Sequence, residues 1–284
     1  LFAPTLAEAM RGCDALFHLA VTYSLWKRDR DRMLHANVAG TREVLAAARK
    51  AGIPRTVHTS SVAAIGVRAD GRPADERHQS SVGELIGAYK RSKFLAEAEV
   101  RRAVALGQDV VIVNPTTPVG PWDAKPTPTG EIVLRFLRGQ MPAYVDTGLN
   151  LIDVRDVATG HLAAYERGAT GARYILGNEN LTLRELLRRL AQITGRRAPR
   201  VRLPYLVPLA YAGLGEFVLS RFGIAPDVSF ESVRMAKQRM YYDSAKARSE
   251  LGLAQSPVTD ALADAVRWFE AHGYVARNRR GAEV

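Results

Sequence analysis

The 284-residue sequence is poor in the residues that build disulfides and metal sites. It has one cysteine, Cys13, which excludes an internal disulfide and is typical of a reducing compartment such as the cytoplasm. Because Cys13 precedes an apolar run, we expect a packed thiol and not a nucleophile. The six histidines show no paired ligand spacing, so we expect no metal site.

The sequence also lacks an uninterrupted apolar run that could span a membrane. Its most apolar segment, residues 203–219, contains two prolines and Glu216, which make it a poor spanning helix. We expect this segment to form a helix of a substrate lobe that packs on the rest of the protein. The alternative is an exposed apolar face that contacts a membrane or a lipid-like substrate.

Positive charge exceeds negative charge, and the net charge of +11 calls for a test of nucleic acid as a partner. Basic clusters such as residues 27–32 are interrupted by acidic residues, and aromatic residues are not interleaved with them. No recognised nucleic-acid motif is present. We therefore expect solvated basic faces and no nucleic-acid partner.

Apolar runs of strand length alternate along the chain with segments of helical periodicity. Strands are expected at residues 13–20, 55–61 and 109–115, and helices at residues 33–50 and 84–106. The last of these strands is nearly continuous valine and isoleucine, which indicates burial on both faces. This order predicts an α/β fold with a Rossmann-like, doubly wound parallel sheet.

The chain is expected to divide near Asn178. Residues 1–177 predict the nucleotide-binding sheet domain, and residues 178–284 predict a smaller, mostly helical substrate lobe. Residues 123–150 are a further candidate part of that lobe, and the tail at 276–284 is expected to be loose.

Tyr89 and Lys93 are four residues apart in a predicted helix, so they lie one turn apart on the same face. A cation beside a phenol lowers the pKa of the tyrosine from about 10 towards the neutral range that a general base needs. Ser61 ends a predicted strand and should face the same crevice, because ligands bind beyond the carboxyl ends of parallel strands. The alternatives are a solvated helix face and, for Ser60 and Ser61, a role in the turn.

Five motifs follow one another along the chain: His18-Leu19-Ala20, Asn37-Val-Ala-Gly40-Thr41, Thr59-Ser60-Ser61, Tyr89 to Lys93, and Asn114-Pro115 ahead of Val119-Gly120-Pro121. In this order they resemble the extended short-chain dehydrogenase/reductase family, also called the NAD-dependent epimerase/dehydratase family. Residues 127–130, 146–157 and 174–182 further resemble hopanoid-associated sugar epimerases, a branch related to dihydroflavonol reductases.

This resemblance implies three catalytic residues and a nicotinamide cofactor, NAD or NADP. Ser61 would bind the reacting oxygen, Tyr89 would transfer its proton, and Lys93 would hold the ribose and lower the pKa of the tyrosine. The residues implied to contact the cofactor are Ala20, Ser60, Tyr89, Lys93 and Pro115. Asn37 would be a supporting polar group, and its alternative is a helix-surface asparagine.

One departure from the family is the absence of its glycine-rich turn, G-x-x-G-x-x-G. Residues 1–4 resemble the segment after the family's third strand, so we expect a fragment that alone binds dinucleotide weakly and is inactive. The residue that would choose between NAD and NADP lies in the segment that is missing.

The resemblance favours a nucleotide-sugar or lipid-linked-sugar substrate, in an epimerase or dehydratase of hopanoid synthesis. Alternatives are an NADPH-dependent ketone reductase similar to dihydroflavonol reductases and a non-catalytic cofactor-binding protein. Candidate diphosphate ligands are Arg135, Arg155 and Arg173, with surface charge as their alternative role. A homodimer and peripheral membrane contact are further expectations.

Overall fold

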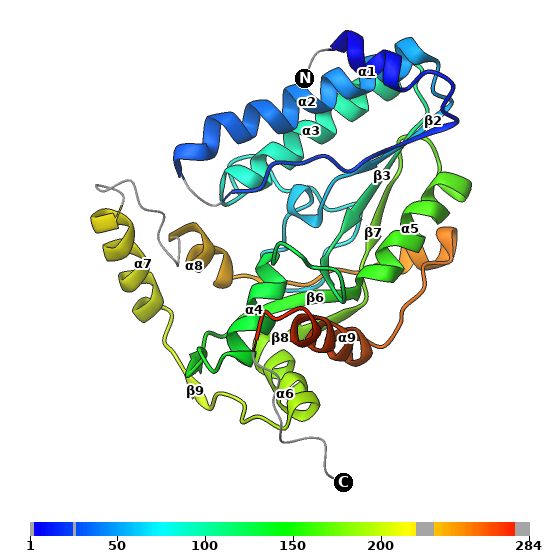
Figure 1. Cartoon of the computed structure of the whole chain (residues 1–284). Helices are drawn as coiled ribbons and strands as arrows, with labels where there is room; N and C mark the ends of the chain where they lie inside the picture. The colour runs from blue at the N-terminus through cyan, green and yellow to red at the C-terminus, as the bar shows by residue number, and fades with distance from the viewer. Residues whose placement is uncertain (1–2, 25–26, 220–229, 276–284) are drawn as a thin grey trace.

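The computed structural model describes residues 3–24, 27–219 and 230–275, and its main element is a four-stranded parallel sheet (Figure 1). The strands lie in the order β1 (Ala15–His18), β2 (Arg55–Thr59), β3 (Val110–Pro115) and β7 (Arg173–Leu176). Helices connect them, so the expected α/β, Rossmann-like parallel sheet is confirmed.

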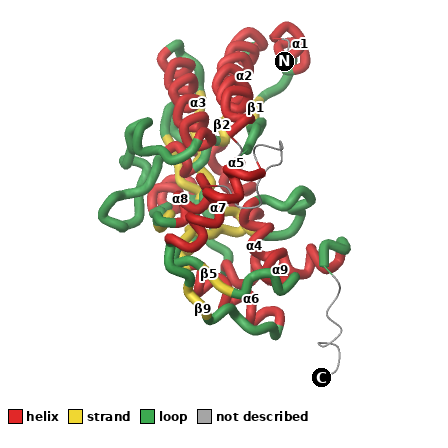
Figure 2. The backbone as a smooth tube through the Cα atoms, turned by 90° about the vertical axis from the view of Figure 1, so that its left-hand side faces the viewer, coloured by secondary structure: helices red, strands yellow, loops and turns green. Residues whose placement is uncertain are grey.

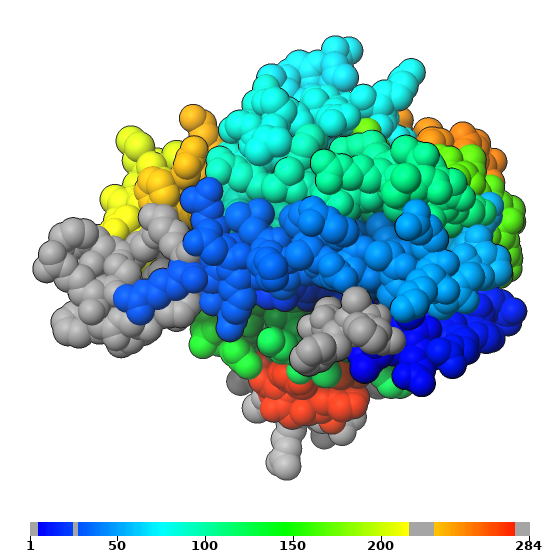
Figure 3. Space-filling model, turned by 90° about the horizontal axis from the view of Figure 1, so that it is seen from above, coloured from blue at the N-terminus to red at the C-terminus, as the bar shows by residue number. Residues whose placement is uncertain are grey.

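Helices cover both faces of this sheet. The helices are α1 (Ala3–Ala9), α2 (Arg30–Ala51, preceded by the 3₁₀ turn Lys27–Asp29), α3 (Ala88–Ala105) and α5 (Val154–Arg167). Figure 1 shows α2 and α3 on one face and α5 on the other, and Figure 3 shows α2 and α3 as adjacent bands seen from above. Arg42 of α2 and Glu99 of α3 form an ion pair at 3.0 Å that joins the two helices.

Alternate residues of β3 point to opposite faces, and both faces are buried. Val111 and Val113 pack with α5, whereas Val110 and Ile112 pack with residues of α2 and α3. This arrangement explains why the strand is nearly continuous valine and isoleucine and not alternately polar.

A second, smaller sheet lies next to the first. It joins β4 (Thr117–Val119), β6 (Gly148–Asp153) and β10 (Arg239–Met240), and β8 (Glu179–Thr182) pairs antiparallel to β6. It shares a core with α4 (Pro128–Leu137), α6 (Leu183–Thr194) and α9 (Val258–Ala271). A capping box between Thr182 and Glu185 fixes the start of α6. Strands β4 and β6 of this sheet precede residue 177, and β8 and β10 follow it. The expected boundary between two domains near Asn178 therefore stays a prediction.

The remaining elements are β5 (Ala143–Tyr144) paired with β9 (Val201–Arg202), α7 (Leu206–Leu219), α8 (Phe230–Ala236) and the π-helical turn Ala247–Leu251. Of these, α7 and α8 lie together at one side of the molecule, whereas the turn Ala247–Leu251 lies beside α5 (Figure 1). Figure 2 shows α7 and α8 from that side. The helix expected within residues 203–219 is present as α7. Its expected packing is wrong for Leu206, Val207, Tyr211 and Leu214, which are 73%, 51%, 65% and 67% exposed. Among the helices of the described ranges, none is both long and apolar enough to cross a membrane.

Two local expectations are corrected by the structure. Cys13 is exposed, because β1 starts only at Ala15 and the cysteine lies in the turn before it. The helix expected from residue 84 starts at Ala88, because Gly87 takes a φ of +93° and interrupts the helix there. The tail at 276–284 lies outside the described residues.

Candidate active site

Ser61 lies where β2 leaves the sheet. It precedes the 3₁₀ turn η2 (Val62–Ala64), and its Oγ accepts a hydrogen bond from the Ala63 amide at 3.1 Å. The turn-forming role expected as an alternative is therefore present. A hydroxyl also has a proton to donate and a second lone pair, so this bond leaves Ser61 able to contact a ligand.

Tyr89 lies in the first turn of α3 and faces Ser61. Burial raises the pKa of the Tyr89 phenol, and hydrogen bonding by the Ser61 side chain opposes this effect. The structure therefore brings together the hydroxyls of two residues that are 28 positions apart in the sequence.

Lys93 lies one turn further along the same face of α3. Its Nζ donates a hydrogen bond to the Thr59 carbonyl at 2.9 Å, two residues before Ser61, and the residue is 4% exposed. Burial lowers the pKa of Lys93 from 10.5 to about 8, and the Glu97 carboxylate opposes this shift. In this structure the pKa of Tyr89 is raised by burial, and Lys93 is not among the groups that shift it, so the expected lowering of that pKa towards neutrality is wrong here.

Glu97 organises the strand ends, and the sequence analysis missed it. Its buried carboxylate accepts hydrogen bonds from Ser60 Oγ at 2.6 Å and from Asn114 Nδ2 at 2.7 Å. Asn114 also donates to the Ser61 carbonyl at 3.0 Å. Glu97 therefore fixes the backbone that carries Ser61, and the hydroxyl of Ser60 is used inside the protein. The sequence feature that could have identified Glu97 is its spacing, because it follows Lys93 by four residues and so lies on the same face of the helix.

Asn37 connects the loop after β1 to the turn of α3 that carries the tyrosine. It is 5% exposed, so the alternative of a helix-surface asparagine is wrong. Its side chain bonds both the amide and the carbonyl of Thr22, at 2.8 and 2.9 Å, and donates to Ser92 Oγ at 2.9 Å. Ser92 Oγ in turn donates to the Tyr89 carbonyl at 2.8 Å. Asn37 thus supports the position of Tyr89 through Ser92.

The remaining expected cofactor residues lie at the carboxyl ends of β1 and β3, the two strands that flank β2. Ala20 is exposed in the loop after β1, and Pro115 is the last residue of β3. Beside Ala20, Leu19 and Val21 are 56% and 45% exposed. An apolar surface next to a buried ammonium and two hydroxyls fits a nicotinamide dinucleotide, in which a flat ring is joined to a polar ribose.

The side-chain oxygen of Asn114 is a buried polar atom without a hydrogen-bond partner among the described residues, as are both ring nitrogens of His58 in β2. Asn114 is 0% exposed, and no hydrogen bond reaches its Oδ1 from the part of the chain that the structure describes. Since buried polar atoms are nearly always paired, this oxygen is compatible with a hydrogen bond to a water or ligand group at the end of β3.

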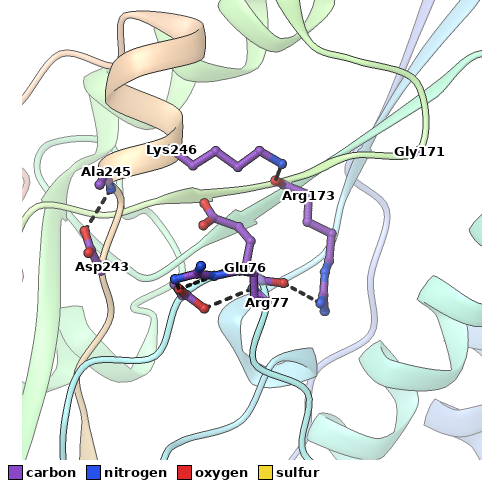
Figure 4. Close-up of a pocket in the computed structure, with 8 residues that line it drawn as sticks. Glu76, Arg77, Gly171, Arg173, Asp243, Ala245 and Lys246 are labelled. Atoms are coloured by element: carbon purple, nitrogen blue, oxygen red, sulfur yellow. Dashed lines mark hydrogen bonds and ion pairs between the residues drawn. The ribbon is translucent and has the colours of Figure 1, made fainter.

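A cavity of about 470 Å³ lies between residues 75–77, 171–173 and 243–246, and its lining includes none of the expected catalytic or cofactor-binding residues (Figure 4). Its charged groups bond within the protein. Lys246 Nζ donates to the Arg173 carbonyl at 3.0 Å, and Arg173 donates to the Glu76 carbonyl at 2.6 Å.

The three arginines proposed as diphosphate ligands are all engaged by carboxylates. Arg135 pairs with Glu131 at 3.0 Å, and Arg155 pairs with Asp153 at 2.5 Å and Asp264 at 2.6 Å. Arg173 lies 3.6 Å from the Glu97 carboxylate. A bound diphosphate would have to compete with these carboxylates for each arginine.

A Rossmann-like sheet with Ser61, Tyr89 and Lys93 near its carboxyl edge is the arrangement expected of the class of nicotinamide-dependent enzymes called short-chain dehydrogenases. The chain belongs to the NAD-dependent epimerase/dehydratase family of that class, whose sequence profile matches residues 3–177. This confirms the family expected from the sequence, and the family uses NAD or NADP.

Individual relatives span nearly the whole chain. A Synechocystis protein provisionally named dihydroflavonol 4-reductase is 60% identical over 95% of this chain and 80% of its own. Sterol demethylase protein B of Methylococcus capsulatus is 34% identical over 95% of this chain and 83% of its own. The crystal structure of a nucleoside-diphosphate-sugar epimerase from Pseudomonas aeruginosa superposes with a TM-score of 0.79 at 28% identity, covering 96% of this chain and 81% of that one.

Proposed function

We propose that this protein uses NAD(P)H to reduce the carbonyl group of an apolar compound at a site made of Ser61, Tyr89 and Lys93. The observation that carries the proposal is the meeting of the Ser61 and Tyr89 side chains one helical turn from the buried Lys93 ammonium. A hydrogen-bond donor, a proton donor and a cation in one place are what carbonyl reduction requires.

The chain's own residues would handle the oxygen and its proton. Ser61 donates a hydrogen bond to the carbonyl oxygen, which polarises it, and Tyr89 gives that oxygen a proton as negative charge develops there. Lys93 holds the ribose hydroxyls of the cofactor, and its positive charge favours the phenolate left on Tyr89. When bound, the nicotinamide supplies the hydride. Glu97 and Asn37 keep the strand end and the helix turn in place.

Two observations favour an apolar carbonyl substrate. The relatives are named for reduction of a dihydroflavonol and for sterol demethylation, and both compounds have a polycyclic skeleton. In addition, α7 exposes Leu206, Val207, Tyr211 and Leu214, which gives the substrate lobe an apolar face. A lipid-like substrate, and peripheral contact with a membrane, would both use such a face.

Epimerisation of a nucleotide sugar or lipid-linked sugar is the second candidate function. The similarity to a nucleoside-diphosphate-sugar epimerase supports it, because reversible hydride transfer at one sugar carbon would also need a proton donor and acceptor beside the nicotinamide. The resemblance to hopanoid-associated epimerases would place this reaction in hopanoid synthesis. A homodimer and a cytoplasmic location belong to both candidates as predictions.

The test replaces the phenol in the full-length protein. Tyr89→Phe should lower turnover by at least about 100-fold, as expected when a positioned acid is removed, with cofactor affinity within about threefold. Tyr165→Phe is the matched control, because it makes the same chemical change on α5, on the other face of the sheet. Turnover that survives in Tyr89→Phe would refute the proposed site.

The same assay separates the two candidate functions. Apolar ketones and nucleotide sugars are supplied in turn while the absorbance of the reduced nicotinamide is followed. Net oxidation of the cofactor with a ketone indicates a reductase, whereas a new sugar isomer without net cofactor change indicates an epimerase.

A further inference from the structure

A carboxylate from the substrate lobe reaches the start of the catalytic helix. Glu231 lies in α8, and Figure 1 places α8 on the side of the molecule where α3 begins. A Cβ added at Gly87 would lie 2.8 Å from Glu231 Oε2, so the carboxylate touches the residue that precedes α3. Tyr89 lies only two residues further along the chain.

A second tyrosine connects this carboxylate to the catalytic phenol. The rings of Tyr23 and Tyr89 pack edge to face, with their centroids 4.7 Å apart. Desolvation raises the pKa of Tyr23 to about 12, with further contributions from the Tyr89 phenol and the Glu231 carboxylate. Tyr23 is 43% exposed, so this ring forms part of the open wall of the site.

Glu231 has no basic partner among the residues that the structure describes. Within residues 3–24, 27–219 and 230–275, no ion pair to Glu231 is formed, and Arg234, three residues further on in α8, is exposed. Lys93 is the cation of the site, but its Nζ bonds the Thr59 carbonyl. The arginines proposed for a diphosphate are paired with other carboxylates.

We infer that Glu231 makes the substrate side of the site anionic, so that the site accepts an uncharged carbonyl compound and rejects carboxylates and phosphates. Tyr23 and Glu231 together offer an aromatic ring beside a hydrogen-bond acceptor, which suits a flat or polycyclic compound that carries a hydroxyl group. This inference rests on the proposed function and narrows its substrate class. It speaks against nucleotide sugars, because their diphosphate would approach an unneutralised carboxylate.

The size of the effect follows from Coulomb's law. Two like unit charges about 7 Å apart at an effective dielectric constant of about 20–40 repel each other enough to weaken binding roughly tenfold. Phenylglyoxylate and phenylglyoxylamide make a suitable pair of probes, because they have nearly the same shape and the same ketone but differ by one negative charge.

The experiment measures binding of both probes by calorimetry to the full-length protein with oxidised cofactor, in which no turnover occurs. The wild type should bind the amide about tenfold more tightly than the acid, and Glu231→Gln should reduce this ratio to within about threefold. Glu166→Gln is the control, because it removes an exposed carboxylate at the end of α5 that leads to β7. The control should keep the wild-type ratio.

The outcomes for the two proposals are separate. A ratio near one in the wild type, or a ratio that Glu231→Gln leaves unchanged, overturns the inference. A lower melting temperature of Glu231→Gln with an unchanged ratio overturns it as well, because the carboxylate would then only dock α8 on α3. Turnover of the amide tests the proposed function, which fails if Tyr89→Phe retains turnover, whatever the binding ratio.

Discussion

Replacing Lys93 by methionine should abolish turnover and yet stabilise the cofactor-free protein. Lys93 is 4% exposed as a residue, and burial lowers the pKa of its ammonium from 10.5 to about 8. Keeping it charged at neutral pH therefore costs about 3.5 kcal/mol of folding free energy, at about 1.4 kcal/mol per pK unit. The hydrogen bond from Lys93 to the Thr59 carbonyl offsets part of this cost, because a hydrogen bond from a charged donor contributes about 1.5–2 kcal/mol of stability.

The net expectation for Lys93→Met is a gain of about 1.5–2 kcal/mol, or about 3–8 °C in melting temperature. The pH dependence fixes the sign. A lysine whose pKa is lowered on folding destabilises fully below its folded pKa of about 8, and the penalty vanishes above the unfolded value of 10.5. The advantage of the methionine variant should therefore shrink as pH rises through that window.

Thermal and urea unfolding at pH 7 and pH 10 test this expectation, with turnover measured in parallel. Lys50→Met is the matched control, because Lys50 is exposed at the end of α2 and its replacement should change stability by less than about 0.5 kcal/mol. A Lys93→Met protein less stable than the wild type at pH 7 would refute the reasoning, since it would show that the ammonium supports the fold.

Two further predictions concern the surroundings of the site. Burial lowers the pKa of His18 to about 4 and that of His58 well below its usual value, so both rings are neutral in the folded protein. Stability should fall as pH drops from about 6.5 towards 4, because the unfolded chain takes up the protons, and His58→Leu should flatten this slope in urea unfolding. If the pH dependence of stability is the same in His58→Leu as in the wild type, His58 is not the group that takes up a proton on unfolding. Gly87→Ala should lower the free energy of unfolding by about 1–2 kcal/mol, because the backbone there has a φ of +93°. It should also lower turnover, because the new Cβ would lie 2.8 Å from Glu231 Oε2. Gly139→Ala, at φ +70° with nothing within 4 Å, isolates the backbone strain, and equal losses of turnover in both variants would argue against the Glu231 contact.

The sequence predicted the sheet because local physics dictates each strand and helix. Continuous valine and isoleucine in β3 and the helical periodicity of α2 fixed the order of elements, and their boundaries were mostly within a few residues of the structure. The exceptions arose where a single residue decides the outcome. Gly87 delays the start of α3 by its positive φ, and Cys13 is exposed because β1 begins two residues later. The expected packing of α7 on the rest of the protein was wrong, because an apolar sequence shows that a helix could be buried but not whether another element covers it.

For the site, the sequence determined the spacing of Tyr89 and Lys93, because four residues are always about one helical turn. It also placed Ser61 at a strand end, where parallel sheets gather their ligands. What only the tertiary structure decided are contacts between segments far apart in the chain. Glu97 accepts hydrogen bonds from Ser60 and Asn114, and Asn37 donates one to Ser92. Glu231 of α8 comes close to Gly87 before α3. Each of these contacts joins separate elements. Periodicity and spacing describe neighbours along one helix or strand, whereas these contacts depend on how the packed elements orient their side chains.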